Sequence, residues 1–162
     1  GLITGALFFL VGVIYERAHT RDLNSFGGLG ATVPVYAGFF ILFALASLGL
    51  PGLCGFVGEF LVFVGAYGVG PFATGLFIPL QIIVALSLLG VILTAGYMLW
   101  TVQRIFLGPL NIKWKGLSDM NLVEIGSLTP LMILTVLLGI YPALILDIVN
   151  KSVFSMLTIL NL

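Results

Sequence analysis

Four long apolar segments alternate with short polar or glycine-rich connections along the chain. They cover about residues 1–15, 33–67, 72–106 and 124–148. Lipid offers no hydrogen-bond partners to exposed backbone groups, and a barrel would need alternating strands, so these runs predict membrane-spanning helices. The tail from Ser152 is also apolar but too short to span, and we expect it to lie along the membrane surface.

The second segment is interrupted by Gly49-Leu50-Pro51-Gly52 and is too long for one straight span. It could be one broken span or two short spans. Lys and Arg collect on the cytoplasmic side of membrane proteins. With one broken span, five of the six basic residues lie on one side, whereas two spans would remove this bias. The sequence therefore favours one broken span, with its break at Pro51, Gly52 and Gly55.

Composition supports a membrane location. The residues are 60% hydrophobic and only 7% charged, with a mean hydropathy of +1.26, whereas soluble domains carry about 25% charged residues. The net charge of zero gives no basic field that would attract nucleic acid. Cys54 is the only cysteine, which excludes an internal disulfide and a cysteine-rich metal site. We therefore predict an all-α integral membrane protein, a bundle of about four transmembrane helices whose second helix is broken at Pro51-Gly52.

The first apolar run would reach only about 22 Å as a helix, against about 30 Å of hydrocarbon. The chain also opens with Gly1 rather than Met. We therefore expect residues 1–162 to be part of one domain of a longer polypeptide.

Glu59 is the only residue with a formal charge between Leu23 and Gln103. A carboxylate near a bilayer centre costs about 2.5–3.5 kcal/mol on insertion scales, and such residues usually mark ion or proton paths. It follows the predicted break by about two turns. The dipole of the second half-helix would stabilise its ionised form, whereas desolvation would favour its neutral form. This balance predicts a proton carrier; the alternative is a hydrogen bond or salt bridge to a neighbouring helix.

The remaining polar and aromatic residues predict no redox or metal chemistry. Tyr97, Trp100 and Trp114 lie near Arg104 and Lys113, a pattern typical of an interfacial aromatic belt. His19 is the only histidine and has no neighbouring residues with the spacing of metal ligands. The sequence also has no Cys cluster and no flavin or nicotinamide motif.

Several stretches together resemble the chain M (subunit 4) type of respiratory complex I, the proton-translocating NADH:quinone oxidoreductase. They are Glu16-Arg17-Ala18-His19-Thr20-Arg21-Asp22, the run from Phe43 to Phe60 with its Gly58-Glu59-Phe60, Tyr97 to Gly108, and Gly139-Ile140-Tyr141-Pro142. The resemblance covers nearly the whole chain. It implies the C-terminal part of a fourteen-helix, inverted-repeat antiporter-like fold. Glu59 then matches the acidic residue of the family's broken helix 12, near the exit of the proton path.

The resemblance also implies partners and location. NADH, flavin, iron–sulfur clusters and quinone are expected on partner subunits, with no cofactor and no metal on this chain. Expected partners are the N-terminal part of the same subunit, other membrane subunits of complex I and lipid, but no nucleic acid. A bacterial cell membrane is favoured over a mitochondrial or thylakoid membrane.

Two other functions stay open. One is a subunit of a membrane-bound hydrogenase or of a cation/proton antiporter. The Mrp antiporters look as though they place a lysine where this chain has Glu59, which argues against them but not against the hydrogenases. The other is a membrane scaffold without a role in transport.

Overall fold

The computed structural model describes residues 1–68 and 79–159. In these ranges the chain forms helices and no strand, which confirms the all-α prediction. The six α-helices are α1 (Leu2–Ala18), α2 (Pro34–Ser47), α3 (Cys54–Gly68), α4 (Leu80–Phe106), α5 (Leu122–Ile140) and α6 (Ala143–Ile159). Short 3-10 helices at Leu23–Ser25, Leu29–Ala31 and Ile112–Trp114 shape the connections.

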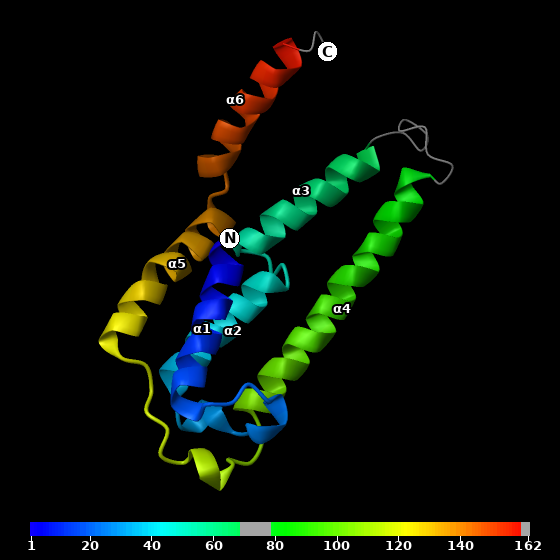
Figure 1. The fold of residues 1–162 in the computed structure, drawn as a ribbon. Helices are drawn as coiled ribbons and strands as arrows, with labels where there is room; N and C mark the ends of the chain where they lie inside the picture. Colours follow the sequence, from blue (N-terminus) through cyan, green and yellow to red (C-terminus); the bar gives the residue numbers. More distant parts are fainter. Residues whose placement is uncertain (69–78, 160–162) are drawn as a thin grey trace.

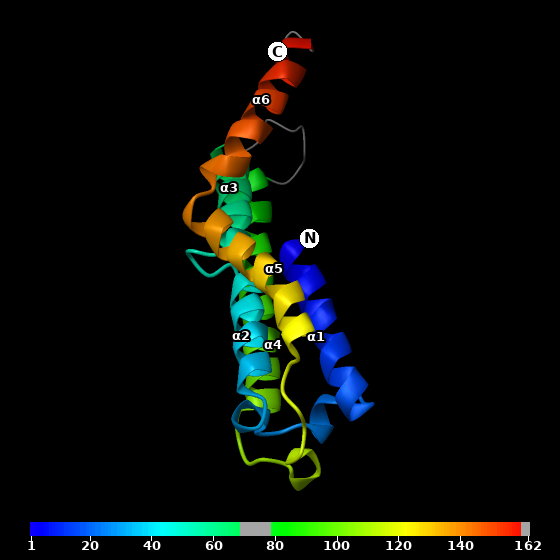
Figure 2. The same ribbon diagram turned by 90° about the vertical axis from the view of Figure 1, so that its left-hand side faces the viewer.

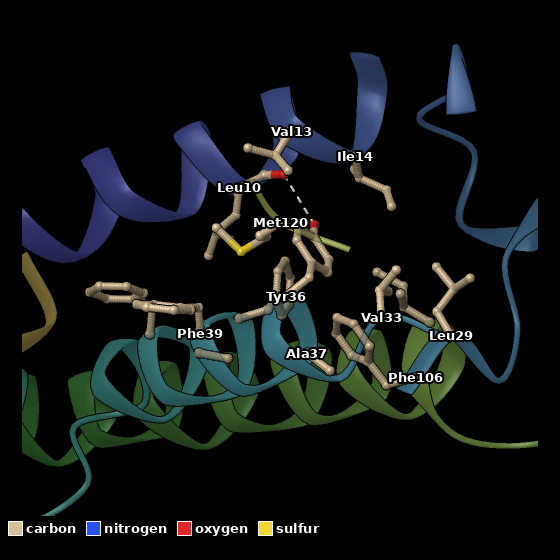
Figure 3. Packing of buried hydrophobic residues seen from close by; sticks show 14 of the residues in the cluster. Leu10, Val13, Ile14, Leu29, Val33, Tyr36, Ala37, Phe39, Phe106 and Met120 are labelled. Atoms are coloured by element: carbon tan, nitrogen blue, oxygen red, sulfur yellow. Dashed lines mark hydrogen bonds between the residues drawn. The ribbon is translucent and has the colours of Figure 1, made fainter. Parts of the chain in front are cut away.

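The buried core lies between α1, α2, α5 and the C-terminal end of α4. Its fully buried side chains include Leu10, Leu29 and Phe43. The Tyr36 hydroxyl enters this apolar region but donates a hydrogen bond to the Leu10 carbonyl over 3.1 Å (Figure 3). That bond ties α1 to α2, because a buried hydroxyl without a partner would be costly.

The other helices leave most of their apolar side chains uncovered. Two helices, α4 and α5, are long and apolar enough to cross a membrane, and none of the most apolar stretch of α4 is buried within the chain. Figures 1 and 2 show α6 projecting beyond the rest of the bundle. An apolar surface of this extent requires lipid or other protein around it.

The helices α2 and α3 lie end to end (Figures 1 and 2). At about 1.5 Å per residue, their 14 and 15 residues are each too short for a hydrocarbon core of about 30 Å. The end-to-end arrangement is the one expected of a single interrupted span, since two separate spans would run back alongside each other.

Several boundaries differ from the prediction. The segment predicted as one helix over residues 124–148 is two helices, because Pro142 has no N–H to donate and disfavours helical geometry at Tyr141. Of the apolar tail from Ser152, the residues up to Ile159 continue α6 without a break, and residues 160–162 lie outside the described ranges. The third segment was predicted from residue 72, but α4 begins at Leu80 and residues 69–78 lie outside the described ranges.

The two basic loops lie at the same end of the bundle, as the distribution of Lys and Arg predicted. The Trp114 indole donates a hydrogen bond to the Ser25 carbonyl over 2.8 Å, and its ring packs against Phe26. Arg104 hydrogen-bonds Asn24. We call this the loop end of the molecule.

Candidate functional site

The site begins where α2 stops. Gly49 has a φ of +70°, a left-handed conformation that favours glycine. The Leu50 N–H donates to the Leu45 carbonyl over 3.2 Å, and the Gly49 N–H donates to the Ala46 carbonyl over 3.3 Å. This pair of bonds is a Schellman motif, which satisfies carbonyls at the end of a helix and stops the helix there.

Pro51 follows two residues after Gly49 and has no N–H with which to continue the helix. Gly52, at a φ of +94°, turns the chain again before α3 begins at Cys54. Pro51 and Gly52 thus lie in the connection between the two helices, and Gly55 lies in the first turn of α3. The helix itself already ends at Ser47, before Pro51, because the Schellman motif stops it.

Two glycines allow other backbones to approach this connection. A methyl group on Gly55 would overlap the Ala46 carbonyl oxygen at the end of α2. A methyl group on Gly139, near the end of α5, would overlap the backbone of Gly52 and Leu53. The end of α2, the start of α3 and the end of α5 therefore meet at van der Waals distance, and any side chain at these glycines would separate them.

The Glu59 carboxyl lies directly against Gly49. A Cβ on Gly49 would be 3.1 Å from the carboxyl carbon of Glu59 and closer still to its Oε2, which is tighter than real side chains tolerate. The carboxyl therefore lies at the C-terminal end of α2, where the helix dipole is negative. The sequence predicted that Glu59 lies in the early part of the second half-helix, and it does. Glu59 is the sixth residue of α3, beyond the first turn over which the α3 dipole acts.

Glu59 also borders a cavity of about 220 Å³ between α3 and α4. Phe56, Phe60 and Phe63 line it from the same face of α3, since they follow one another at steps of four and three residues along a helix. Leu88 and Val91 line it from α4. Apart from Glu59, the side chains that line this cavity are apolar.

Glu59 is half-buried rather than buried by this chain. Its carboxyl forms no ion pair within residues 1–68 and 79–159, where the one ion pair is Arg17–Glu124. The burial expected from the sequence is thus not provided by the described residues themselves. In the same ranges, no three His, Cys, Asp or Glu side chains are placed to hold a metal ion.

A second polar cluster, at the loop end, was not predicted. The Arg17 guanidinium of α1 donates to both carboxylate oxygens of Glu124 in α5, over 3.0 and 2.8 Å. It also donates to the Asp119 carbonyl. The side chains of Arg17 and Glu124 are only 13% and 14% exposed. A forked, shielded pair of this kind fixes one helix against the other.

Asp119 caps α2 from a distant part of the chain. The N-cap residue Val33 has no side-chain acceptor, and Pro34 has no N–H. The Asp119 carboxylate accepts hydrogen bonds from the backbone N–H groups of Val35 and Tyr36, over 2.9 and 3.1 Å. A contact across more than eighty residues leaves no local pattern in the sequence. The neighbouring capping box, Asn121 with Glu124, was recognisable from its spacing.

Trp114 corrects the predicted aromatic belt. Its side chain is only 5% exposed and joins the two loops, whereas Tyr97 and Trp100 are exposed as an interfacial belt requires. Indole side chains suit both roles, so sequence position alone could not separate them.

Comparisons with known proteins agree with one another. A family model described as NADH:quinone oxidoreductase/Mrp antiporter, transmembrane, matches residues 1–85. The chain is 42% identical to NADH-quinone oxidoreductase subunit M of Rhodobacter capsulatus over 154 residues, which are 94% of this chain and 28% of the relative. It is 37% identical to NADH-ubiquinone oxidoreductase chain 4 of Arabidopsis thaliana, covering 94% of this chain and 29% of the relative.

A solved structure is also similar. A chain of respiratory complex I from Thermus thermophilus with bound NADH matches with a TM-score of 0.74 and 34% identity, over 86% of this chain and 27% of that one. The chain thus spans less than a third of the length of these relatives.

Proposed function

We propose a function from the premise that this chain belongs to the NADH:quinone oxidoreductase/Mrp antiporter transmembrane family. The proposal is that the chain is part of a proton-translocating membrane subunit of an NADH:quinone oxidoreductase, and that Glu59 carries a proton in that process. The relatives named as subunit M and chain 4 support the first part. The second part depends on the site.

One observation carries the role of Glu59. It is the only charged residue between Leu23 and Gln103, and its carboxyl lies against the point where α2 is interrupted. Interrupted helices at membrane depth are recurrent ion sites in transporters. A carboxylate kept in such a position at an insertion cost of about 2.5–3.5 kcal/mol calls for a functional explanation.

The geometry suggests how a proton would act there. The negative end of the α2 dipole repels an ionised carboxylate, and this repulsion ceases when Glu59 takes up a proton. Protonation and the arrangement of the break are then linked, because each changes the energy of the other. The cavity beside Glu59 supplies room for water, while the polar groups needed to order that water come from outside the described residues.

The redox chemistry belongs to other subunits in this proposal. NADH, flavin, iron–sulfur clusters and quinone are bound elsewhere in the complex, and this chain responds to them through a change in conformation. The rest of the subunit covers α3 and α4 and completes the fourteen-helix fold. Lipid surrounds what remains exposed, in the membrane that holds the complex, for which we favour a bacterial cell membrane.

The test is proton pumping by the assembled complex in closed vesicles, compared at matched electron flux. We expect Glu59→Gln to assemble but to lower the number of protons pumped per electron. Glu16→Gln is a matched control, because it makes the same chemical change in an exposed carboxylate at the end of α1. Normal pumping by Glu59→Gln would refute the proposal.

The test also separates the two other functions. If Glu59→Gln lowers only the yield of assembled complex, a scaffold is the better description, and the hydrogen-bonded loop end would be its main feature. If pumping by the wild type needs sodium or potassium, or electrons reach protons rather than quinone, the chain belongs to an antiporter or a hydrogenase.

A further inference from the structure

We propose that Gly49 is a positioning residue for proton transfer. Because Gly49 has no side chain, it leaves a space at the end of α2, which we call the notch, and the Glu59 carboxyl occupies that space. The inference rests on the proposed role of Glu59. It assigns the position of the carboxyl to a particular residue of the break.

The contact between position 49 and the Glu59 carboxyl is close and specific. A Cβ on Gly49 would come within 3.1 Å of the carboxyl carbon and 3.5 Å of Oε1, and nearer still to Oε2. All three nearest atoms belong to Glu59. A larger residue at position 49 would therefore displace this carboxyl before it disturbed anything else.

Gly52 shares the backbone conformation of Gly49 but not its contact with Glu59. Both glycines have positive φ, +70° at Gly49 and +94° at Gly52, and both belong to the same short connection. A Cβ on Gly52 would meet nothing within 4 Å. Backbone strain is therefore common to the two positions, whereas contact with Glu59 is specific to Gly49.

The Schellman motif at the end of α2 fixes the position of Gly49. Gly49 is the residue whose N–H closes the Schellman motif on Ala46, so its position is fixed by the end of α2. The Glu59 carboxyl thus lies at the negative end of that helix, between the cap and the cavity lined by Phe56 and Phe60. A carboxyl pushed off the notch would lie further from the helix end, and its protonation would be less tightly linked to the break.

The experiment uses the assembled complex in vesicles and measures protons pumped per electron across a range of pH. The variants are Gly49→Ala, Gly52→Ala, Gly108→Ala and Glu59→Gln. Gly108 has a φ of +94° and open space around it at the loop end, so its variant reports the cost of positive φ far from the site.

We expect Gly49→Ala to lower pumping about tenfold and to shift its pH profile, while Gly52→Ala changes pumping less than threefold and leaves the profile in place. Gly108→Ala should pump normally. Combining Gly49→Ala with Glu59→Asp, which shortens the side chain by one methylene, should recover part of the pumping that Gly49→Ala loses.

Equal losses for Gly49→Ala and Gly52→Ala would overturn the inference, because backbone strain would then explain both. Wild-type pumping by Gly49→Ala would overturn it as well. Normal pumping by Glu59→Gln would instead overturn the proposed function, so the two failures are distinguishable.

If the complex with Gly49→Ala does not assemble, the contact between position 49 and Glu59 is tested by the yield of assembled complex. In a Glu59→Ala background the carboxyl is absent, and Gly49→Ala should then assemble as well as Gly52→Ala does in that background. Continued failure of Gly49→Ala there would overturn the inference.

Discussion

The cap that Asp119 supplies to α2 gives a prediction whose size can be worked out. Its carboxylate accepts from the backbone N–H groups of Val35 and Tyr36, the first two of α2 that need a partner. Replacing a capping side chain by alanine costs about 0.5–2 kcal/mol. Loss of a negative charge at a helix N-terminus costs about 0.3–1 kcal/mol more.

For Asp119→Ala we therefore expect the first turn of α2 to be destabilised by about 2 kcal/mol. Since about 1.4 kcal/mol is a factor of ten, its amides should exchange with deuterium about thirtyfold faster. Asp119→Asn keeps one carbonyl acceptor and loses the charge, so about 0.7 kcal/mol and a threefold increase are expected.

The assay is hydrogen–deuterium exchange by mass spectrometry on the purified complex, read in peptides that cover residues 34–40. Asp147→Ala is the control, because Asp147 is exposed on α6 and its carboxylate has no hydrogen bond in the described part of the chain. Peptides from α4 should not change in any variant. Unchanged exchange in residues 34–40 of Asp119→Ala would refute the reasoning.

Two further predictions concern packing between helices. Arg17→Ala leaves the Glu124 carboxylate shielded and without its cation, which costs about 2 kcal/mol of stability after allowance for the residual exposure of the pair. The assembled complex that carries Arg17→Ala should therefore survive detergent and heat less well. The double variant Arg17→Ala, Glu124→Ala should recover part of that loss, whereas strictly additive losses would contradict the pairing. Gly139→Ala should reduce the yield of complex on native gels, because overpacking costs about 1–3 kcal/mol and the opposing atoms are backbone. Gly126→Ala, on the same helix with open space around it, should be neutral, and equal losses for both variants would contradict the steric explanation.

Much of the fold follows from the sequence because lipid imposes simple rules. Long apolar runs must be helices, and the asymmetry of Lys and Arg placed both basic loops at one end. Glu59 was predictable as a candidate site because it is the only residue with a formal charge between Leu23 and Gln103. These are properties of local composition, which sequence reasoning reads well.

Contacts between distant segments could not be read in this way. The Asp119 cap and the burial of Trp114 depend on how the loops meet, and each residue type has a common alternative role. The environment of Glu59 was only partly predictable for the same reason. Counting residues from Pro51 correctly placed Glu59 in the early part of α3, but it could not show that the carboxyl also contacts Gly49 at the end of α2.

The helix α5 has a consequence for how the molecule would transmit force. Near one end, Glu124 is clamped by Arg17, and near the other, Gly139 touches the backbone of Gly52 and Leu53. The fifteen residue steps from Glu124 to Gly139, at about 1.5 Å each, span about 22 Å. Such a helix is stiff along its axis, while Pro130 removes one hydrogen bond midway and lets it bend. A displacement of the loop end would thus be passed along α5 to the α2–α3 connection, so α5 is a direct mechanical link between the loop end and the interruption beside Glu59.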